Sequence, residues 1–415
     1  MTPRIVPATA NPLTSRNRFA GGGVAVLGDD FTDRETERAD IARSLRTPRG
    51  HLVVAGLRRM GKTSILLAVR DELVKTGAPV LYVDLWTAST IEDMTTRLAT
   101  AAAGALGRRW LDTVKQLGRT LKLGFEVSET SGGIMMPIPK LEFRDAPMNA
   151  QRQRLVDALD ALEQLATKHK AHLSVIIDEF QEIERLGSEG PEAKRVSAMR
   201  QVRAAIQHHK HVTYVFAGSD RRLIQQLHAE DGGALHNLGR KYDIGPIESN
   251  HLAQWIQRQF RAMGIDGAGH GHRIIHVAGP RTRDIRTLAE TVAELARDSA
   301  VVTEFTIESA MRTILRQRRP SYDADWKALT RLQQNVLRAV AVDGTGLTKR
   351  DTRARFGLSD ASAISKTIEA LVDRSLLLRD DGHVTFDDPF YRGWVIESAL
   401  PDVGLRLPVT FVPTR

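Results

Sequence analysis

The chain has 415 residues, and its 59 lysines and arginines exceed its 50 aspartates and glutamates, which gives a formal net charge of +9. This length allows two or three domains, and the absence of cysteine excludes disulfides, thiolate zinc sites and thiol catalysis. No stretch approaches the roughly eighteen apolar residues of a membrane span, and the first residues lack the apolar centre of a secretory signal, so we expect a cytoplasmic protein without a membrane partner.

The positive charge has two interpretations. It favours an acidic partner, and nucleic acid is the most common one. Alternatively, an arginine-rich chain simply carries its surplus arginine on solvated surfaces. The charge alone does not decide between them.

Residues 1–30 are predicted to form a flexible tail. Prolines at positions 3, 7 and 12 and three successive glycines at 21–23 interrupt any regular pattern there. The first helix is predicted to follow, from about residue 34 to about residue 45.

A glycine loop lies between a short apolar run at 51–55, typical of a buried strand, and an apolar helical stripe at 64–70. It matches G-x-x-x-x-G-K-[ST], and strand, loop and helix are the context that this motif requires. Glycine permits close backbone approach, so successive N–H groups and the helix terminus can face phosphate oxygens. Lys62 can reach the β- and γ-phosphates, and Thr63 can ligate Mg²⁺. The predicted nucleoside triphosphate site comprises Gly56, Leu57, Arg58, Arg59, Met60, Gly61, Lys62, Thr63 and Ser64.

Strands and helices alternate over the next 150 or so residues, a pattern that favours a mostly parallel sheet with helices on both faces. Strands are predicted at 79–85, 173–178 and 212–218, and helices at 90–118, 148–169 and 192–208. Two alternating runs around Ser-Gly-Gly indicate a hairpin inserted at about 120–144.

Two adjacent carboxylates end the aliphatic strand at 173–178. Downstream of a glycine loop, Asp178 is expected to help hold the Mg²⁺, and Glu179 to polarise a water molecule for attack on the γ-phosphate. Because Glu179 is present, the sequence favours hydrolysis over binding alone.

The strand at 212–218 ends next to Ser219. This serine is a candidate sensor of the γ-phosphate, or else Ser219 or Asp220 caps the helix predicted at 221–228. Both interpretations can hold together. An arginine finger is not assigned, although position makes Arg221, Arg222 and Arg240 candidates.

Taken together, several segments resemble the archaeal-type ATPase family, which belongs to the AAA+-like and signal-transduction branch of P-loop ATPases, alongside the origin-recognition type. These segments are Phe31 with Arg34, the glycine loop, Asp-Glu-Phe-Gln from Asp178, Ala217 to Ser219, and Asp388-Pro389 with Trp394. The resemblance covers about residues 31–397. It implies an α/β P-loop NTPase (ASCE/AAA+-like) parallel sheet core, a helical lid and a C-terminal winged-helix domain, with ATP as the nucleotide and Phe31 and Arg34 beside its adenine.

A looser match concerns the lid. Gly279-Pro280-Arg281 resembles the Gly-x-Pro lid motif of this branch without its spacer residue. The resemblance implies that Pro280 contacts the adenine and Arg281 a phosphate. The alternative is a turn that joins two helices, which Gly-Pro makes without any ligand.

The C-terminal part is interpreted as a winged helix: three short helices, the last from about 360 to 373, and a two-stranded wing around an Asp-Gly turn. A helix of this type commonly lies in the major groove of DNA. Such units also serve as packing or protein-contact modules, and the third helix offers no Asn, Gln or Arg for base edges. The candidate DNA contacts are Arg353, Arg355, Ser362, Ser365, Lys366 and Arg374.

The predicted division is a core at 31–248, a lid at 249–320 with a boundary at 316–321, a winged helix at 321–400 and a tail at 401–415. The predicted activity is Mg²⁺-dependent hydrolysis of ATP, slow without a partner, that couples the nucleotide state to the winged helix. That domain would act on double-stranded DNA. The alternative is an ATP-switched signalling protein, in which the winged helix contacts a protein partner or a second copy of the chain.

Overall fold

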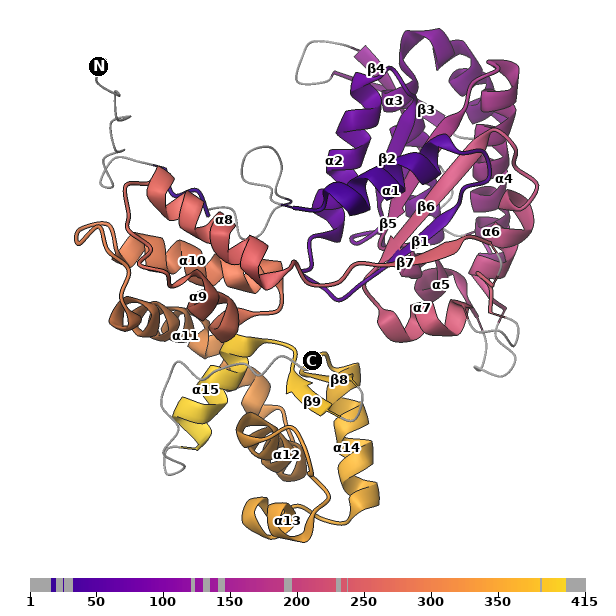
Figure 1. The fold of residues 1–415 in the computed structure, drawn as a ribbon. Coiled ribbons are helices and arrows are strands. Elements are labelled where there is room, and N and C mark those ends of the chain that lie inside the picture. Colours follow the sequence, from indigo (N-terminus) through magenta and orange to yellow (C-terminus); the bar gives the residue numbers. More distant parts are fainter. Residues whose placement is uncertain are drawn as a thin grey trace, which may run out of the picture. The chain divides into compact units, whose positions relative to one another are not determined.

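The structure is a computed structural model that describes residues 16–19, 25, 33–120, 124–129, 135–140, 146–189, 196–228, 233–236, 238–380 and 383–400. The chain forms two compact units (Figure 1). One consists of Ala25–Gly245, and the other combines Met1–Val24 with Pro246–Arg415.

A parallel sheet of five strands is the centre of the first unit, counted over the described residues, and its strand order is β2-β5-β6-β1-β7. β5 and β6 are buried along their whole length, as aliphatic strands between two helical layers should be. The strands are β1 (Leu52–Ala55), β2 (Val80–Asp84), β5 (Leu173–Asp178), β6 (Val212–Gly218) and β7 (Arg240–Asp243).

Helices cover both faces of this sheet, which confirms the predicted α/β class (Figure 1). α1 and α2 bury their apolar sides on one face, and α3, α4 and α6 pack on the other. The helices are α1 (Glu35–Arg46), α2 (Lys62–Lys75), α3 (Ile91–Thr120), α4 (Met148–Lys168), α5 (Gln181–Gly187), α6 (Ala198–Ile206) and α7 (Arg221–His228).

Two elements of this unit differ from the prediction. The helix expected at 192–208 begins only at Ala198, and α5, which we did not predict, precedes it. β7 was also missed, because its sequence Arg-Lys-Tyr-Asp is polar and largely exposed and so gives no apolar signal. It is an edge strand that pairs with β1 on one side only.

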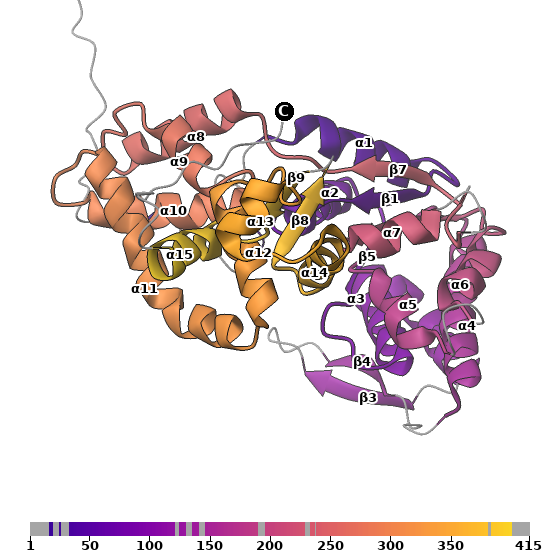
Figure 2. The same ribbon diagram turned by 90° about the horizontal axis from the view of Figure 1, so that it is seen from below.

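The predicted hairpin insert is present as β3 (Gly124–Glu129) and β4 (Met135–Lys140), which pair in antiparallel fashion. It lies beside α3, outside the parallel sheet (Figure 2).

In the second unit, four helices follow Pro246: α8 (Ser249–Ala262), α9 (Gly271–Ala278), α10 (Thr282–Leu295) and α11 (Glu304–Lys327). The N-terminal residues Arg16 to Phe19 belong to the same unit. Phe19 is fully buried, with its ring centroid 5.6 Å from that of Trp255 and 5.1 Å from that of Phe260. The expectation of a flexible tail is therefore wrong for residues 16–19.

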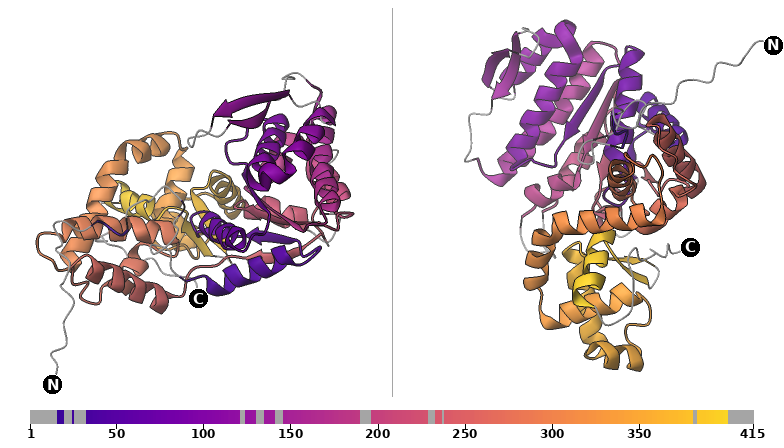
Figure 3. Two further views of the ribbon diagram at one scale, coloured as in Figure 1. Left: turned by 90° about the horizontal axis from the view of Figure 1, so that it is seen from above. Right: turned by 90° about the vertical axis from the view of Figure 1, so that its left-hand side faces the viewer.

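The boundary predicted at 316–321 lies inside α11, which runs without interruption through Pro320 (Figure 3, right). A proline within a helix costs about 3 kcal/mol. Packing after the proline offsets this cost, since the ring of Tyr322 packs at a tilt against Tyr391 and Trp326 meets Trp394 edge-on, at centroid distances of 4.9 and 5.6 Å.

The C-terminal elements have the order and spacing predicted for a winged helix. Asp360 caps α14 by accepting the N–H of Ala363, and the side chains of Ile364, Ile368 and Leu371 are buried on its inner side. The elements are α12 (Arg331–Val342), α13 (Arg350–Phe356), α14 (Ala361–Asp373), β8 (Leu377–Asp380), β9 (His383–Phe386) and α15 (Pro389–Ala399). Among the helices of the described residues, none is long and apolar enough to cross a membrane.

A buried polar cluster lies where β1 and β6 begin. His51 Nδ1 accepts the N–H of Tyr214 at 3.1 Å, and the ring of His209 lies between the Tyr214 hydroxyl and Asp160, at 3.0 and 2.9 Å. The side chain of His209 is 4% exposed. Burial, helped by the nearby His209 and Arg49, lowers the pKa of His51 from 6.5 to about 4.

Protonation of His51 is expected to destabilise the fold in acid. The unfolded chain takes up this proton below pH 6.5 and the folded chain only near pH 4, so the stability present above pH 6.5 is lost as the pH falls through this window. The free energy of unfolding should fall by about 2.5 kcal/mol between pH 7.5 and pH 4.5 from this group. Urea unfolding at both pH values checks the expectation, with His51→Gln, whose amide oxygen can still accept the Tyr214 N–H, as the comparison. Equal losses in both proteins would contradict it.

Candidate functional site

The glycine loop joins β1 to α2, and its two glycines are required for different reasons. A Cβ on Gly56 would lie 2.7 Å from the backbone oxygen of Ile244, so the close approach of these segments needs glycine. Gly61 has a φ of +88°, the left-handed region, at the position that caps α2. A Cβ on Gly61 would meet no atom within 4 Å, so the loop backbone is open on that side.

Lys62 is the first residue of α2, and its side chain folds back over the loop. Its Nζ donates to the backbone oxygens of Gly56 and Leu57, both at 2.9 Å. The ammonium group therefore lies against the loop whose N–H groups are predicted to face phosphate.

Thr63 and Asp178 are 115 residues apart in the sequence and meet at this edge of the sheet. Thr63 Oγ1 donates to Asp178 Oδ2 at 2.8 Å, and the Tyr82 hydroxyl donates to the same oxygen at 3.0 Å. The structure thus brings together the two side chains predicted to hold Mg²⁺. Tyr82 was not predicted, because nothing in the sequence distinguishes its hydroxyl from any other in a strand.

The chemistry of Asp178 fits a divalent cation. Burial raises the pKa of its carboxyl group, with the hydrogen bond from Thr63 acting in the opposite direction, and no ion pair to Asp178 is found among the described residues. A cation next to Asp178 would compensate its buried charge. Among the residues that the structure describes, no group of three or more His, Cys, Asp or Glu side chains is arranged to hold a metal. Mg²⁺ usually takes one or two carboxylates and completes its shell with water and phosphate.

Glu179 directly follows and has a φ of +53°, the left-handed region, where the chain leaves β5. Its Oε2 accepts from Ser219 Oγ at 2.8 Å and from Gln181 Nε2. Asp220, and not Ser219, caps α7 by accepting the N–H of Leu223 at 2.9 Å. The structure therefore places Ser219 against Glu179, and its role as a phosphate sensor stays a prediction.

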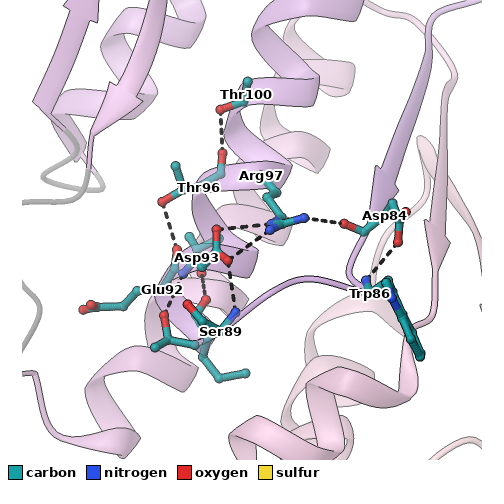
Figure 4. Close-up of polar contacts among 11 residues, drawn as sticks. Asp84, Trp86, Ser89, Glu92, Asp93, Thr96, Arg97 and Thr100 are labelled. Carbon is teal, nitrogen blue, oxygen red and sulfur yellow. Dashed lines mark hydrogen bonds and ion pairs between the residues drawn. The ribbon is translucent and has the colours of Figure 1, made fainter. Parts of the chain in front are cut away.

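The loop after β2 lies beside the glycine loop and is held by polar contacts (Figure 4). Asp84 Oδ1 accepts the N–H of Trp86 at 2.8 Å. Arg97 donates to the backbone oxygen of Asp84 at 3.1 Å and to the carboxylate of Asp93 at 3.2 Å. Trp86 is 50% exposed, and the Arg58 guanidinium lies 4.6 Å from its ring centroid. The side chain of Arg58, one of the predicted site residues, thus stacks on Trp86.

The remaining candidates for the nucleotide site are placed as follows. Arg34 is 4% exposed and donates to the Gly245 oxygen at 2.6 Å, so it ties the start of α1 to the chain that follows β7. Phe31 lies outside the described residues, as do the side chains of Arg221 and Arg222. Arg240 is exposed on β7, with its guanidinium 5.3 Å from the ring centroid of Tyr242.

Arg281, predicted to contact a phosphate, has a partner within the second unit. Its guanidinium forms a two-pronged ion pair with Asp387, one bond being 2.8 Å, and its side chain is 3% exposed. Next to it, Arg318 and Tyr322 of α11 both bind Asp388. Gly279-Pro280 does join α9 to α10, as the alternative interpretation required. A phosphate contact of Arg281 stays a prediction. A phosphate would have to compete with Asp387 for the Arg281 guanidinium.

The candidate DNA contacts all lie on α13 and α14 or at their ends. On α14, Ser362 and Lys366 are exposed and Ser365 is half-buried, and Arg374, which directly follows the last residue of α14, is exposed. On α13, Arg355 is exposed and Arg353 is half-buried.

Comparison with known proteins identifies the core. Residues 31–273 match the family model described as an ATPase domain predominantly from Archaea. The chain belongs to this family. A second match, at residues 320–397, is to a probable winged helix domain, so the archaeal-type ATPase core carries the C-terminal winged helix that the sequence predicted.

Solved structures share the fold of this archaeal-type ATPase. A Walker-type ATPase of Pyrococcus abyssi matches with a TM-score of 0.56 and 18% identity, over 88% of this chain and 96% of that one. The ORC2 protein of Aeropyrum pernix in an ADP form matches with a TM-score of 0.50 and 14% identity, over 92% of this chain and 96% of that one. At these identities the likeness shows the fold alone. The comparison with curated proteins gave no match.

Proposed function

We propose that this chain binds ATP with Mg²⁺ and hydrolyses it to ADP and phosphate. The observation that carries the proposal is the contact of Thr63, which follows the loop lysine, with Asp178, next to which Ser219 binds the carboxylate of Glu179. Thr63 and the Asp178-Glu179 pair come from two segments far apart in the sequence, and structural stability does not require them to converge next to an open loop of glycine backbone.

Each residue has a distinct part in the proposed reaction. The loop N–H groups and Lys62 bind the β- and γ-phosphates, and Thr63 and Asp178 hold the Mg²⁺. When bound, the ion neutralises charge on the phosphate oxygens. Glu179 accepts a proton from water while the water oxygen bonds to the γ-phosphorus. The bond from that phosphorus to the bridging oxygen breaks, and ADP leaves with the electron pair.

The nucleotide state is proposed to reach the winged helix through the second unit. The buried pair of Arg281 with Asp387 joins the start of α10 to the segment before α15, so a displacement of α10 would be transmitted to the C-terminal elements. We propose double-stranded DNA as the partner of the winged helix, since its exposed residues include Lys366, Arg355 and Arg374. The alternative is a protein partner or a second copy of the chain, and Glu369, exposed on α14, favours it over sequence-specific DNA contact.

Duplex DNA is expected to bind at low salt and to stimulate ATP hydrolysis. Lys366→Glu should weaken binding at least tenfold and make its salt dependence less steep, because each lost phosphate contact removes about 0.9 from the slope of log K against log salt. Fluorescence anisotropy at several salt concentrations measures both quantities. Lys210→Glu, an exposed lysine between α6 and β6, is the charge-matched control. If wild type shows no binding at low salt, the DNA proposal is wrong and the protein-contact alternative stands.

A further inference from the structure

Gln181, the first residue of α5, lies next to the proposed general base and has no assigned role. Its side chain is fully buried, and its Nε2 donates to Glu179 Oε2, the oxygen that also accepts from Ser219. The opposite orientation of the amide would place two acceptors face to face, so the hydrogen bond fixes the amide as it is. Among the described residues, no hydrogen bond to Glu179 Oε1 is found.

The other atom of this amide, Gln181 Oε1, is buried without a hydrogen-bond partner in the described part of the chain. Burying an unsatisfied polar atom costs about 1–3 kcal/mol. A methionine at position 181 would fill nearly the same space without this cost. The stability of the fold therefore gives no reason for glutamine here, and the contact with Glu179 does.

Gly218, the last residue of β6, makes the room that the amide occupies. A Cβ on Gly218 would lie 2.4 Å from Gln181 Oε1. The φ of Gly218 is not positive, so any residue could adopt its backbone conformation. Glycine is therefore needed here only because a side chain would not fit. The same Cβ would also lie 3.0 Å from the Phe180 ring and 3.1 Å from Ile224, so glycine at this position leaves room for the amide and for these two side chains.

We propose that Gln181 is a positioning residue for hydrolysis. Together with Ser219 it holds one oxygen of the Glu179 carboxylate, so that Oε1 is the oxygen directed to the attacking water. Because two donors from two elements bind the same oxygen, rotation of the carboxylate is restricted, and a general base must be held within hydrogen-bond reach of its water. The inference rests on the proposed ATP hydrolysis and adds to it the residue that orients the base.

Gln181→Met is expected to lower kcat for ATP at least tenfold while KM stays within about twofold, since the side chain does not contact the nucleotide. The melting temperature should stay the same or rise, because a buried unsatisfied oxygen is removed. Steady-state hydrolysis and thermal unfolding measure these quantities. An unchanged kcat would overturn the proposal, and so would a fall in kcat explained by a destabilised protein with a raised KM.

Gly218→Ala tests the same contact from the other side. The added methyl group should displace the Gln181 amide and lower kcat to a similar extent. In the double variant Gln181→Ala/Gly218→Ala the amide is already gone, so the second change should cause little further loss. Losses that multiply would mean that the two residues act independently and would contradict the inference.

The comparison with Lys62→Ala separates this inference from the proposed function. If wild type hydrolyses ATP no faster than Lys62→Ala, the proposed function itself fails, and the positioning role with it. If wild type is faster and Gln181→Met equals wild type, the function stands and only the role of Gln181 is wrong.

Discussion

Lys62→Ala is expected to abolish ATP hydrolysis, with a loss of at least about 100-fold in kcat/KM. The ammonium group lies over the glycine loop, bound to the backbone oxygens of Gly56 and Leu57. Without it, the charge that develops on the γ-phosphate loses its main protein counter-charge. Phosphate release under steady-state conditions measures the effect, and nucleotide titration shows the accompanying loss of affinity.

Lys75→Ala is the matched control, because Lys75 is an exposed lysine at the other end of the same helix, α2. It should hydrolyse ATP as wild type does. The melting temperatures of both variants should be compared, since Lys62 is 6% exposed and its loss also removes two hydrogen bonds to the loop backbone. Hydrolysis by Lys62→Ala at the wild-type rate would refute the assignment of the whole site.

Glu179→Gln is expected to separate binding from hydrolysis. The amide has nearly the shape of the carboxylate but is not a base, so kcat should fall about 10²- to 10⁴-fold while ATP still binds. Its oxygen can still accept from Ser219 and Gln181, which preserves the surroundings of the site. Chromatography of the nucleotide retained by the protein should therefore find ATP on the variant and ADP on wild type.

Glu182→Gln, three residues further along and paired with Arg185, is the control for removing a carboxylate from this segment. It should leave hydrolysis unchanged. Two results would count against the proposed role of Glu179: turnover by the variant at the wild-type rate, or failure of the variant to bind ATP.

The parallel sheet and the glycine loop could be predicted because their signals are local. A buried strand such as Leu173–Asp178 is a continuous aliphatic run, and the requirements at Gly56 and Gly61 are fixed by the loop itself. The meeting of Thr63 with Asp178 was also predictable, since the carboxyl ends of parallel strands share one edge of the sheet.

Contacts that depend on tertiary packing were not predictable. The pairing of Arg281 with Asp387 joins residues 106 apart, and the sequence offers many arginines and acids as alternatives. Likewise, nothing in the sequence around His209 indicates that its ring is buried between the Tyr214 hydroxyl and Asp160. The boundary predicted at 316–321 was wrong because the side chains that stabilise α11 after Pro320 pack against α15, some seventy residues later in the sequence.

The packing of Phe19 has a consequence for how the two units are connected. Since residues 16–19 pack in the same unit as Trp255 and Phe260, the ATPase core is inserted into the chain of its neighbour and is attached to it at both ends, near residues 24 and 245. A domain on one linker can swivel freely about it. A domain that is joined to its neighbour through two chain connections keeps fewer independent motions than a domain on one linker.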